Sequence, residues 1–406
     1  MSHPAFPQYG VRIKKTSFCD DSVKISDANG TKHFPESWNS NANVFFIDQP
    51  VGVGYSYADF GEAVGGTEDA AKDIAAFVAV FFENFSKFKG RAFHLAGESY
   101  AGRYLPLFAS EVYDQNARLV KAGVTPINIA SIIIGNGWTD ALSMVLSYFD
   151  MQCTAASVAP IMDIASCVRM KQVLPRCEKW VKQSCVDLYD SINCHAALQF
   201  CGAELSEPFA TTGRNVYDVS KECEGGPSDL CYPVTAHITA YLNSSSTRTL
   251  LGVDPSIPTP YSICSGPVSS VFDAARDEER PETPLHVAAL LERGVRVLIY
   301  AGTYDFICNW IGNERWTRAL DWSGHEEFAA QDLRPWNVDV NGVQKRAGIT
   351  RSAGGLRFAT VEGAGHMVGV FLTVLDVELT GFFEVPYDKP KEALALINRW
   401  IAGEEL

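Results

Sequence analysis

The sequence lacks any run of about 18 uncharged apolar residues, so we expect no membrane-spanning helix. Basic residues are few, because 34 Lys and Arg stand against 48 Asp and Glu, and the formal net charge is −14. This shortage of positive charge argues against nucleic acid or an anionic membrane surface as a partner. We therefore expect a protein with neither a nucleic-acid nor a membrane partner.

The Cys-x-x-Cys pair of common zinc sites is absent, although cysteine itself is plentiful. Nine of the 11 cysteines lie between Cys153 and Cys264. This density predicts disulfides and an oxidising compartment, with zinc as the alternative that the spacings fit poorly. Residues 1–18 also lack the apolar segment of a signal peptide. A disulfide-rich chain without a leader leads us to expect an incomplete N-terminus.

The composition is that of a globular protein, with 47% hydrophobic and 20% charged residues in a chain of 406. Short apolar runs alternate with helical patterns, which predicts a parallel α/β sheet. The expected strands are 43–47, 92–96, 131–134, 295–300 and 357–361. The expected helices are 67–85, 102–121, 284–293 and 390–401, with Thr67 as the N-terminal cap of the first.

The alternation is interrupted between residues 146 and 271. This stretch holds most of the cysteines and few strand-like runs. We interpret it as an inserted helical subdomain tied by disulfides. Residues 1–145 and 272–406 would then be the first and second parts of one α/β core.

A pattern for nucleophilic catalysis follows the expected strand 92–96. Residues 97–102 read Gly-Glu-Ser-Tyr-Ala-Gly and lead into an expected helix. In this arrangement a sharp strand-to-helix turn exposes the hydroxyl of Ser99, and small residues on both sides let the turn pack. The turn also directs the backbone N–H of Tyr100 toward a developing oxyanion. The alternative is an ordinary turn, because a bare Gly-x-Ser-x-Gly is a weak signal.

Two later strand ends supply the partners that such a serine needs. Asp305 follows the expected strand 295–300, and His366 follows 357–361 within a Gly-Ala-Gly-His turn. The order Ser, Asp, His is that of the hydrolases built on a nucleophile elbow. The histidine would take the serine proton, and the carboxylate would orient the imidazole. The alternatives are a turn carboxylate and a surface histidine.

With these motifs in place, the chain resembles the serine carboxypeptidases, especially the fungal enzymes similar to carboxypeptidase Y. The resemblance covers most of residues 37–368 and then 386–401. The segments that carry it are 37–43, 48–57, 97–104, 134–137, 215–218, 300–313 and 365–368. It implies an α/β-hydrolase fold with the inserted disulfide-rich helical subdomain, and no metal or organic cofactor.

The resemblance also implies roles for individual residues. Ser99 would be the nucleophile, His366 the general base and Asp305 its partner, with Tyr100 as a backbone oxyanion donor. Glu98 would bind the terminal carboxylate of the substrate by sharing a proton, which favours acidic pH.

Four further residues resemble the lining of the family's substrate pocket. They are Tyr217, Tyr232, Cys308 and Met367, of which Cys308 matches a buried unpaired thiol. For the two tyrosines and the methionine, a plain packing role is the equal alternative.

The cysteine order implies the bridges Cys153–Cys167, Cys177–Cys201, Cys185–Cys194 and Cys223–Cys231. Each would add about 2–3 kcal/mol by constraining the unfolded chain. Asn29, Asn84 and Asn243 begin sequons for glycosylation. With the family, these features imply a vacuolar or secreted glycoprotein.

The sequence departs from the family pattern at two places. Between Phe34 and Ser37 it lacks a long stretch with two strands and a Gly-rich motif that supplies the second oxyanion N–H and most partners of the terminal carboxylate. The loss of one such donor costs about 10²–10³ in rate. The bridge partner of Cys264 is also missing, and Cys19 is an unsupported substitute. Residues 369–385, conversely, have no counterpart. We interpret the two departures as a skipped exon segment and a retained intron.

The best interpretation is a serine-type carboxypeptidase that releases C-terminal residues of peptides through an acyl-enzyme. An acyltransferase or esterase on the same fold is one alternative. A catalytically impaired or non-catalytic homologue is another, because the oxyanion segment is absent.

Overall fold

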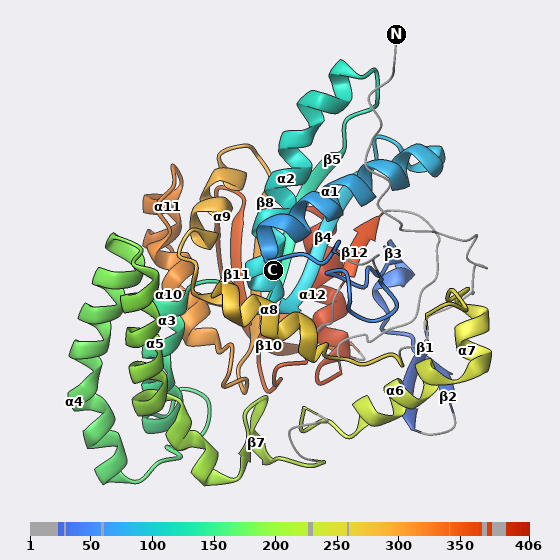
Figure 1. The fold of residues 1–406 in the computed structure, drawn as a ribbon. Coiled ribbons are helices and arrows are strands. Elements are labelled where there is room, and N and C mark those ends of the chain that lie inside the picture. The colour runs from blue at the N-terminus through green and yellow to red at the C-terminus, as the bar shows by residue number, and fades with distance from the viewer. Residues whose placement is uncertain are drawn as a thin grey trace.

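The structure, a computed structural model, describes residues 23–27, 30–57, 61–225, 230–257, 260–340, 342–367, 372–375 and 387–406. Its main feature is an eight-stranded sheet with the order β3-β12-β4-β5-β8-β11-β10-β9 (Figure 1). In that order the strands are Asn43–Phe45, Leu372–Leu375, Ala92–Ser99, Asn128–Gly137, Arg296–Gly302, Leu356–Val361, Val343–Ala353 and Arg334–Val340.

The middle of the sheet is parallel, as the sequence predicts. β4, β5, β8 and β11 pair in parallel. β10 then pairs antiparallel with β11, and β9 pairs antiparallel with β10. The run Ile132, Ile133 and Ile134 of β5 is fully buried, because helices cover both faces of a parallel sheet. The five expected strands are confirmed as β3, β4, β5, β8 and β11.

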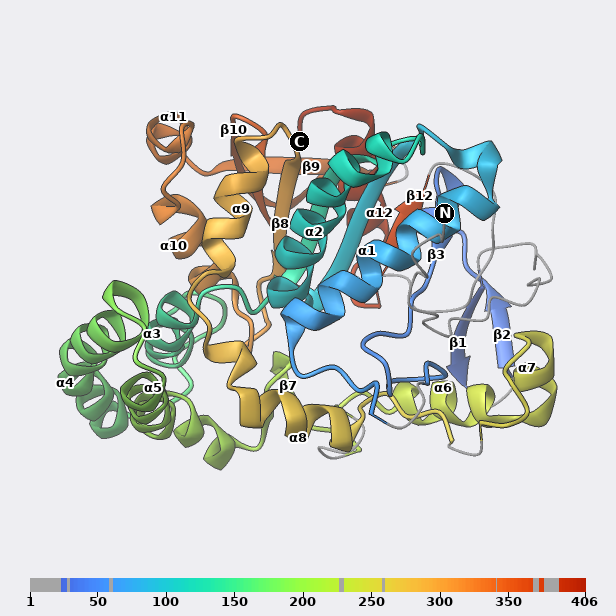
Figure 2. The same ribbon diagram turned by 45° about the horizontal axis from the view of Figure 1, so that its top comes forward.

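Helices form a layer on each face of the sheet (Figure 2). α1 (Thr67–Asn84), α2 (Ala101–Lys121) and α9 (Thr283–Leu291) contribute to one apolar core, together with residues from α10 (Trp310–Ala319) and α11 (His325–Ala330). α12 (Pro390–Ala402) packs against the other face, where Leu396 and Trp400 are buried. The four expected helices are therefore confirmed.

The cap that we predict for the first helix is wrong. Thr67 is the first residue inside α1, and its side chain does not cap the helix. Its backbone N–H donates instead to Asp277 Oδ1 at 2.9 Å, and its hydroxyl donates to Asp277 Oδ2 at 2.5 Å. A carboxylate 210 residues away satisfies this helix N-terminus, which local sequence patterns do not reveal.

A mainly helical region follows β5. It contains α3 (Ala141–Cys153), α4 (Ile164–Val181), the π-helix η3 (Lys182–Asp187) and α5 (Ser191–Leu205). Shorter elements continue it: η4 (Glu207–Thr212), β6 (Arg214–Asn215), β7 (Asp218–Glu222), α6 (Val234–Asn243), α7 (Ser245–Leu250), α8 (Gly266–Ala275) and η6 (Asp277–Glu279). The 3-10 helices η1 (Trp38–Ser40) and η2 (Ser86–Phe88) and the hairpin β1 (Val23–Asp27) with β2 (Gly30–His33) complete the described elements.

Four disulfides stabilise the helical region. They join Cys153 to Cys167, Cys177 to Cys201, Cys185 to Cys194 and Cys223 to Cys231, as the resemblance implies. Among the described cysteines, Cys264 is exposed and Cys308 is buried, and neither is bridged. Cys19 lies outside the described residues, as do Asn29 and most of 369–385.

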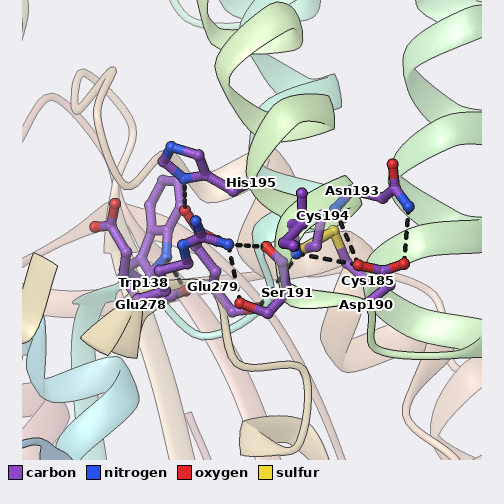
Figure 3. Close-up of a disulfide and its surroundings, with 11 residues drawn as sticks. Trp138, Cys185, Asp190, Ser191, Asn193, Cys194, His195, Glu278 and Glu279 are labelled. Atoms are coloured by element: carbon purple, nitrogen blue, oxygen red, sulfur yellow. Dashed lines mark hydrogen bonds and ion pairs between the residues drawn. A yellow bond between two sulfur atoms is a disulfide. The ribbon is translucent and has the colours of Figure 1, made fainter. Parts of the chain in front are cut away.

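The helical region is joined to the core beside the Cys185–Cys194 bridge (Figure 3). His195 of α5 lies 2.5 Å from Glu279 Oε1 on η6. Arg276, the residue before η6, donates to Ser191 Oγ at 2.9 Å. The start of α5 is therefore held against the segment that also carries Asp277.

The part of 369–385 that the structure describes lies inside the main sheet. β12 pairs antiparallel with β3 on one side and with β4 on the other, and Thr373 stands opposite both Phe45 and Leu95. β12, which falls in the segment for which we expect no counterpart in the family, thus lies next to the strand that leads to Ser99.

Candidate active site

Ser99 occupies the strained turn that the motif predicts. It is the last residue of β4, its φ is +62°, and α2 begins two residues later. A left-handed non-glycine residue between a strand and a helix is the geometry of a nucleophile elbow. The Ser99 carbonyl accepts a hydrogen bond from Trp138 N at 2.9 Å, which ties the turn to the end of β5.

The small residues around Ser99 are required by close backbone packing. A Cβ on Gly97 would lie 2.5 Å from the Ala101 Cβ, and a Cβ on Gly102 would lie 2.6 Å from Trp138 N. Ala101 itself is accommodated and buried. The pattern Gly-x-Ser-x-Ala-Gly therefore reflects the space available at each position.

We expect Gly102→Ala to lower the free energy of unfolding by about 1–3 kcal/mol, because the new methyl group would overlap backbone atoms of Trp138. Chemical denaturation measures the change. The matched control is Gly202→Ala within α5, where a Cβ would meet nothing within 4 Å. That control is expected to be neutral or stabilising by up to about 1 kcal/mol. Equal effects of the two substitutions would contradict the packing argument.

Asp305 and His366 meet in the buried interior. His366 Nδ1 lies 2.8 Å from Asp305 Oδ2, and Asp305 is completely buried. The same Oδ2 accepts a hydrogen bond from Asn136 Nδ2 at 2.7 Å, and Oδ1 accepts from Ile307 N at 3.0 Å. These three donors fix the carboxylate, and the contact with Nδ1 leaves Nε2 as the nitrogen that is free to take a proton.

Asn136 is a site residue to which the sequence analysis assigned no role. It is fully buried, has a φ of +42°, and lies at the end of β5. Its Oδ1 accepts a hydrogen bond from Gly302 N at 3.2 Å, so its amide joins two neighbouring strand ends. The signal that would have found it is an Asn-Gly pair at the end of a buried strand.

Cys308 brings the serine into the same cluster. Its sulfur, a carboxylate oxygen of Asp305 and a ring nitrogen of His366 all lie within 4.8 Å of one another. The Ser99 side chain is close enough to the Cys308 sulfur to act to lower the pKa of the thiol. Burial, together with the nearby carboxylates Asp305 and Glu98, raises the pKa of the thiol well above its ordinary value. Cys308 therefore stays a neutral thiol next to the serine.

The three residues Asp305, Cys308 and His366 are also the one metal-ligand cluster among the described residues. Both Asp305 oxygens already accept hydrogen bonds, and one of them contacts His366 Nδ1. This donor set therefore fits an oriented histidine better than a metal centre.

The aromatic residues with predicted pocket roles lie around His366. The Tyr217 ring is tilted against the imidazole with 5.1 Å between ring centroids, and its carbonyl accepts from His366 N at 2.7 Å. Tyr232 and Met367 are buried in one apolar cluster, which Tyr217 also contacts. Tyr232 is only 4% exposed, so packing accounts for most of its side chain.

The remaining predicted residues, Glu98 and Tyr100, flank the serine. Glu98 is buried, and it lies near enough to Tyr300 to contribute to the raised pKa of that phenol, after burial itself. The Tyr100 hydroxyl donates to Asp277 Oδ2 at 2.8 Å. Asp277 therefore binds both the start of α1 and the residue that follows the serine.

A model of the serine carboxypeptidase family matches residues 22–403. The chain belongs to the serine carboxypeptidase family. It is similar to the protein named carboxypeptidase Y homolog A of Talaromyces stipitatus, with 40% identity over 371 residues, which are 91% of this chain and 61% of that relative. The protein of the same name from Paracoccidioides brasiliensis is 39% identical over 380 residues, which are 93% of this chain and 63% of the relative.

Among solved structures, the chain is similar to Kex1(delta)p, a prohormone-processing carboxypeptidase from Saccharomyces cerevisiae. The TM-score is 0.73 at 21% identity, and the match covers 94% of this chain and 78% of that one. This member of the family therefore has the predicted α/β-hydrolase fold with its disulfide-bonded helical region. The chain spans less than two thirds of the length of the first two relatives. Among the described residues, no helix is long and apolar enough to cross a membrane.

Proposed function

We propose that the protein is a serine-type carboxypeptidase that releases C-terminal amino acids from peptides, with peptides or proteins bearing a free C-terminus as substrates. The observation that carries the proposal is the 2.8 Å contact of His366 with the buried Asp305. Cys308 lies in the same cluster, and Ser99, on its strained turn, is close enough to Cys308 to affect the pKa of that thiol. Family membership supports the same activity.

The reaction uses three side chains in turn. Ser99 Oγ attacks the carbonyl carbon of the last peptide bond while His366 Nε2 takes its proton. The histidine gives this proton to the leaving amine, the C–N bond breaks, and the free amino acid departs. Water, deprotonated by the same histidine, then hydrolyses the acyl-enzyme. Asp305 stabilises the imidazolium that forms in each half of the cycle.

The neighbouring residues would bind and stabilise the substrate. The Tyr100 N–H, at the start of α2, would donate to the oxyanion. Glu98 would hold the terminal carboxylate through a shared proton, which favours acidic pH. Tyr217, Tyr232, Cys308 and Met367 would line the pocket, of which the Tyr217 ring contacts the histidine itself.

An acidic compartment fits this chemistry. We propose a vacuolar or secreted location, supported by the four disulfides, because such bridges persist in oxidising compartments. Glycosylation would suit Asn84 better than Asn243. Asn84 is exposed, whereas the Asn243 amide is tied to Tyr261, accepting from its N–H and donating to its carbonyl.

Two matched peptides test the function. One peptide ends in a free carboxylate, and the other has the same sequence with a C-terminal amide. At pH 4.5 to 6, mass spectrometry is expected to show stepwise loss of C-terminal residues from the first peptide and at least a tenfold slower reaction of the second, because the amide offers no carboxyl group to share a proton with Glu98. Equal cleavage of both peptides, or cleavage at internal bonds, would rule out a carboxypeptidase.

A non-catalytic homologue is the second candidate. It is favoured by the direct connection from Phe34 to Ser37, without the expected oxyanion motif, and by β12 beside β4. A folded protein that neither shortens the peptide nor reacts with a fluorophosphonate would support this candidate.

A further inference from the structure

The turn that carries His366 is held by a residue far along the chain. Asp388 Oδ2 accepts a hydrogen bond from Gly365 N at 2.9 Å. The backbone N–H groups of Tyr387 and Asp388 both donate to Met367 O, at 3.1 and 3.3 Å. The residues on both sides of the histidine are therefore bound to the same short segment.

The histidine backbone is held from the opposite side by Tyr217. His366 N donates to the Tyr217 carbonyl at 2.7 Å, and a Cβ on Gly365 would lie 2.4 Å from that carbonyl oxygen. Each of the three consecutive residues 365–367 thus makes a backbone hydrogen bond to a partner outside the turn. This arrangement leaves the imidazole little freedom to leave Asp305.

Asp388 is itself fixed by the groups around it. Its side chain is 5% exposed, Tyr232 Oη donates to Oδ2 at 3.3 Å, and Lys221 Nζ lies 3.7 Å from Oδ1. Lys221 also pairs with Asp218 Oδ2 at 2.6 Å. Burial raises the pKa of Asp388, and Lys221 and the Gly365 N–H oppose this shift. The carboxyl group is thus built into the interior as a fixed acceptor.

We propose that Asp388 is a positioning residue for the general base, which acts by holding Gly365 so that His366 stays on Asp305. This inference rests on the proposed function. It also explains how the turn tolerates the 369–385 segment, because the chain leaves at Met367 and returns to it at Tyr387.

The test compares Asp388→Ala with Asp388→Asn. Alanine removes the acceptor of Gly365 N, so we expect kcat to fall 10- to 100-fold with KM changed less than threefold. The rate constant for labelling by a fluorophosphonate should fall by the same factor. Asparagine keeps an amide oxygen in the same place and should restore both rates to within about threefold of the wild type.

The matched control is Asp163→Ala. Asp163 also accepts a backbone N–H, that of Ser166 at the start of α4, in the helical region. The substitution Asp163→Ala should lower the free energy of unfolding without changing kcat. If Asp388→Ala does not fold, Asp388→Glu keeps the charge but displaces the oxygens by one methylene, and it should still lower kcat.

A folded Asp388→Ala or Asp388→Glu variant with the kcat of the wild type would overturn the proposal. An equal fall of kcat in Asp163→Ala would overturn it as well. A fall in Asp388→Asn as large as in Asp388→Ala would also overturn it, because the acceptor would then not be what matters. Failure of the proposed function is distinguishable, because in that case the wild type itself would not shorten the peptide with the free carboxylate, whereas the labelling rates would still compare the Asp388 variants.

Discussion

Ser99→Ala is expected to abolish labelling by a fluorophosphonate and to lower peptide cleavage about 10⁴- to 10⁶-fold. The reason is that the serine hydroxyl is the attacking group, so no acyl-enzyme forms without it. The fold should be retained, because alanine is similar in size and the turn is held by Gly97, Gly102 and the Trp138 N–H. Active-site labelling at pH 5 to 7, read out by intact-protein mass spectrometry, measures the effect.

The structure offers a stringent control for this substitution. Ser110 in α2 is hydrogen-bonded to a histidine, with its Oγ 2.9 Å from His286 Nδ1. Ser110 lies within a regular helix and also donates to the Pro106 carbonyl, so its oxygen is not presented on an elbow. Ser110→Ala should keep full labelling. Labelling that persists in Ser99→Ala and disappears in Ser110→Ala would show that the nucleophile is misassigned.

Asp305→Asn is expected to lower kcat about 10³- to 10⁴-fold. Both carboxylate oxygens of Asp305 accept hydrogen bonds from N–H donors, those of Asn136, Ile307 and His366. An amide has only one acceptor, so its NH₂ group must face either Ile307 N or the pair Asn136 and His366. In both orientations the negative charge beside the imidazolium is lost. If the NH₂ group faces Asn136 and His366, it also forces the wrong tautomer on His366. Steady-state kinetics on a peptide substrate measure the loss.

Asp150→Asn is the matched control for this second substitution. Asp150 accepts a hydrogen bond from Arg315 at 2.8 Å in a partly exposed pair, and such pairs contribute little to stability. It should leave kcat unchanged. A value of kcat for Asp305→Asn within tenfold of the wild type would mean that His366 does not depend on this carboxylate.

The sequence predicts those parts of the molecule whose structure is determined by residues close to one another in the chain. The buried strands are recognisable because they are continuous apolar runs, and Ser99, Asp305 and His366 because each follows such a run in a glycine-rich turn. The structure brings Asp305 and His366 into contact across 61 residues. Parallel strand ends meet at one edge of the sheet, which is why this contact follows from local patterns.

The groups that support the site are not predictable in this way. Asp277 lies 210 residues from the helix N-terminus that it caps, and Asp388 lies 23 residues from Gly365, beyond a segment with no family counterpart. Nothing in the local sequence of Asp277 distinguishes it from a surface carboxylate, and the match of residues 386–401 to the family does not reveal that Asp388 contacts Gly365. The position of β12 is equally hidden, because a four-residue strand acquires its place from the neighbours that leave room for it.

The short helix η6 has a consequence for how the molecule unfolds. Asp277 binds the start of α1 and the Tyr100 hydroxyl, while Glu279, two residues on, contacts His195 of the disulfide-bonded helical region (Figure 3). Opening of either part therefore strains the contacts of the other. The helical region and the nucleophile elbow should open as one cooperative unit, with similar protection of their amides from hydrogen exchange, rather than as two independent bodies.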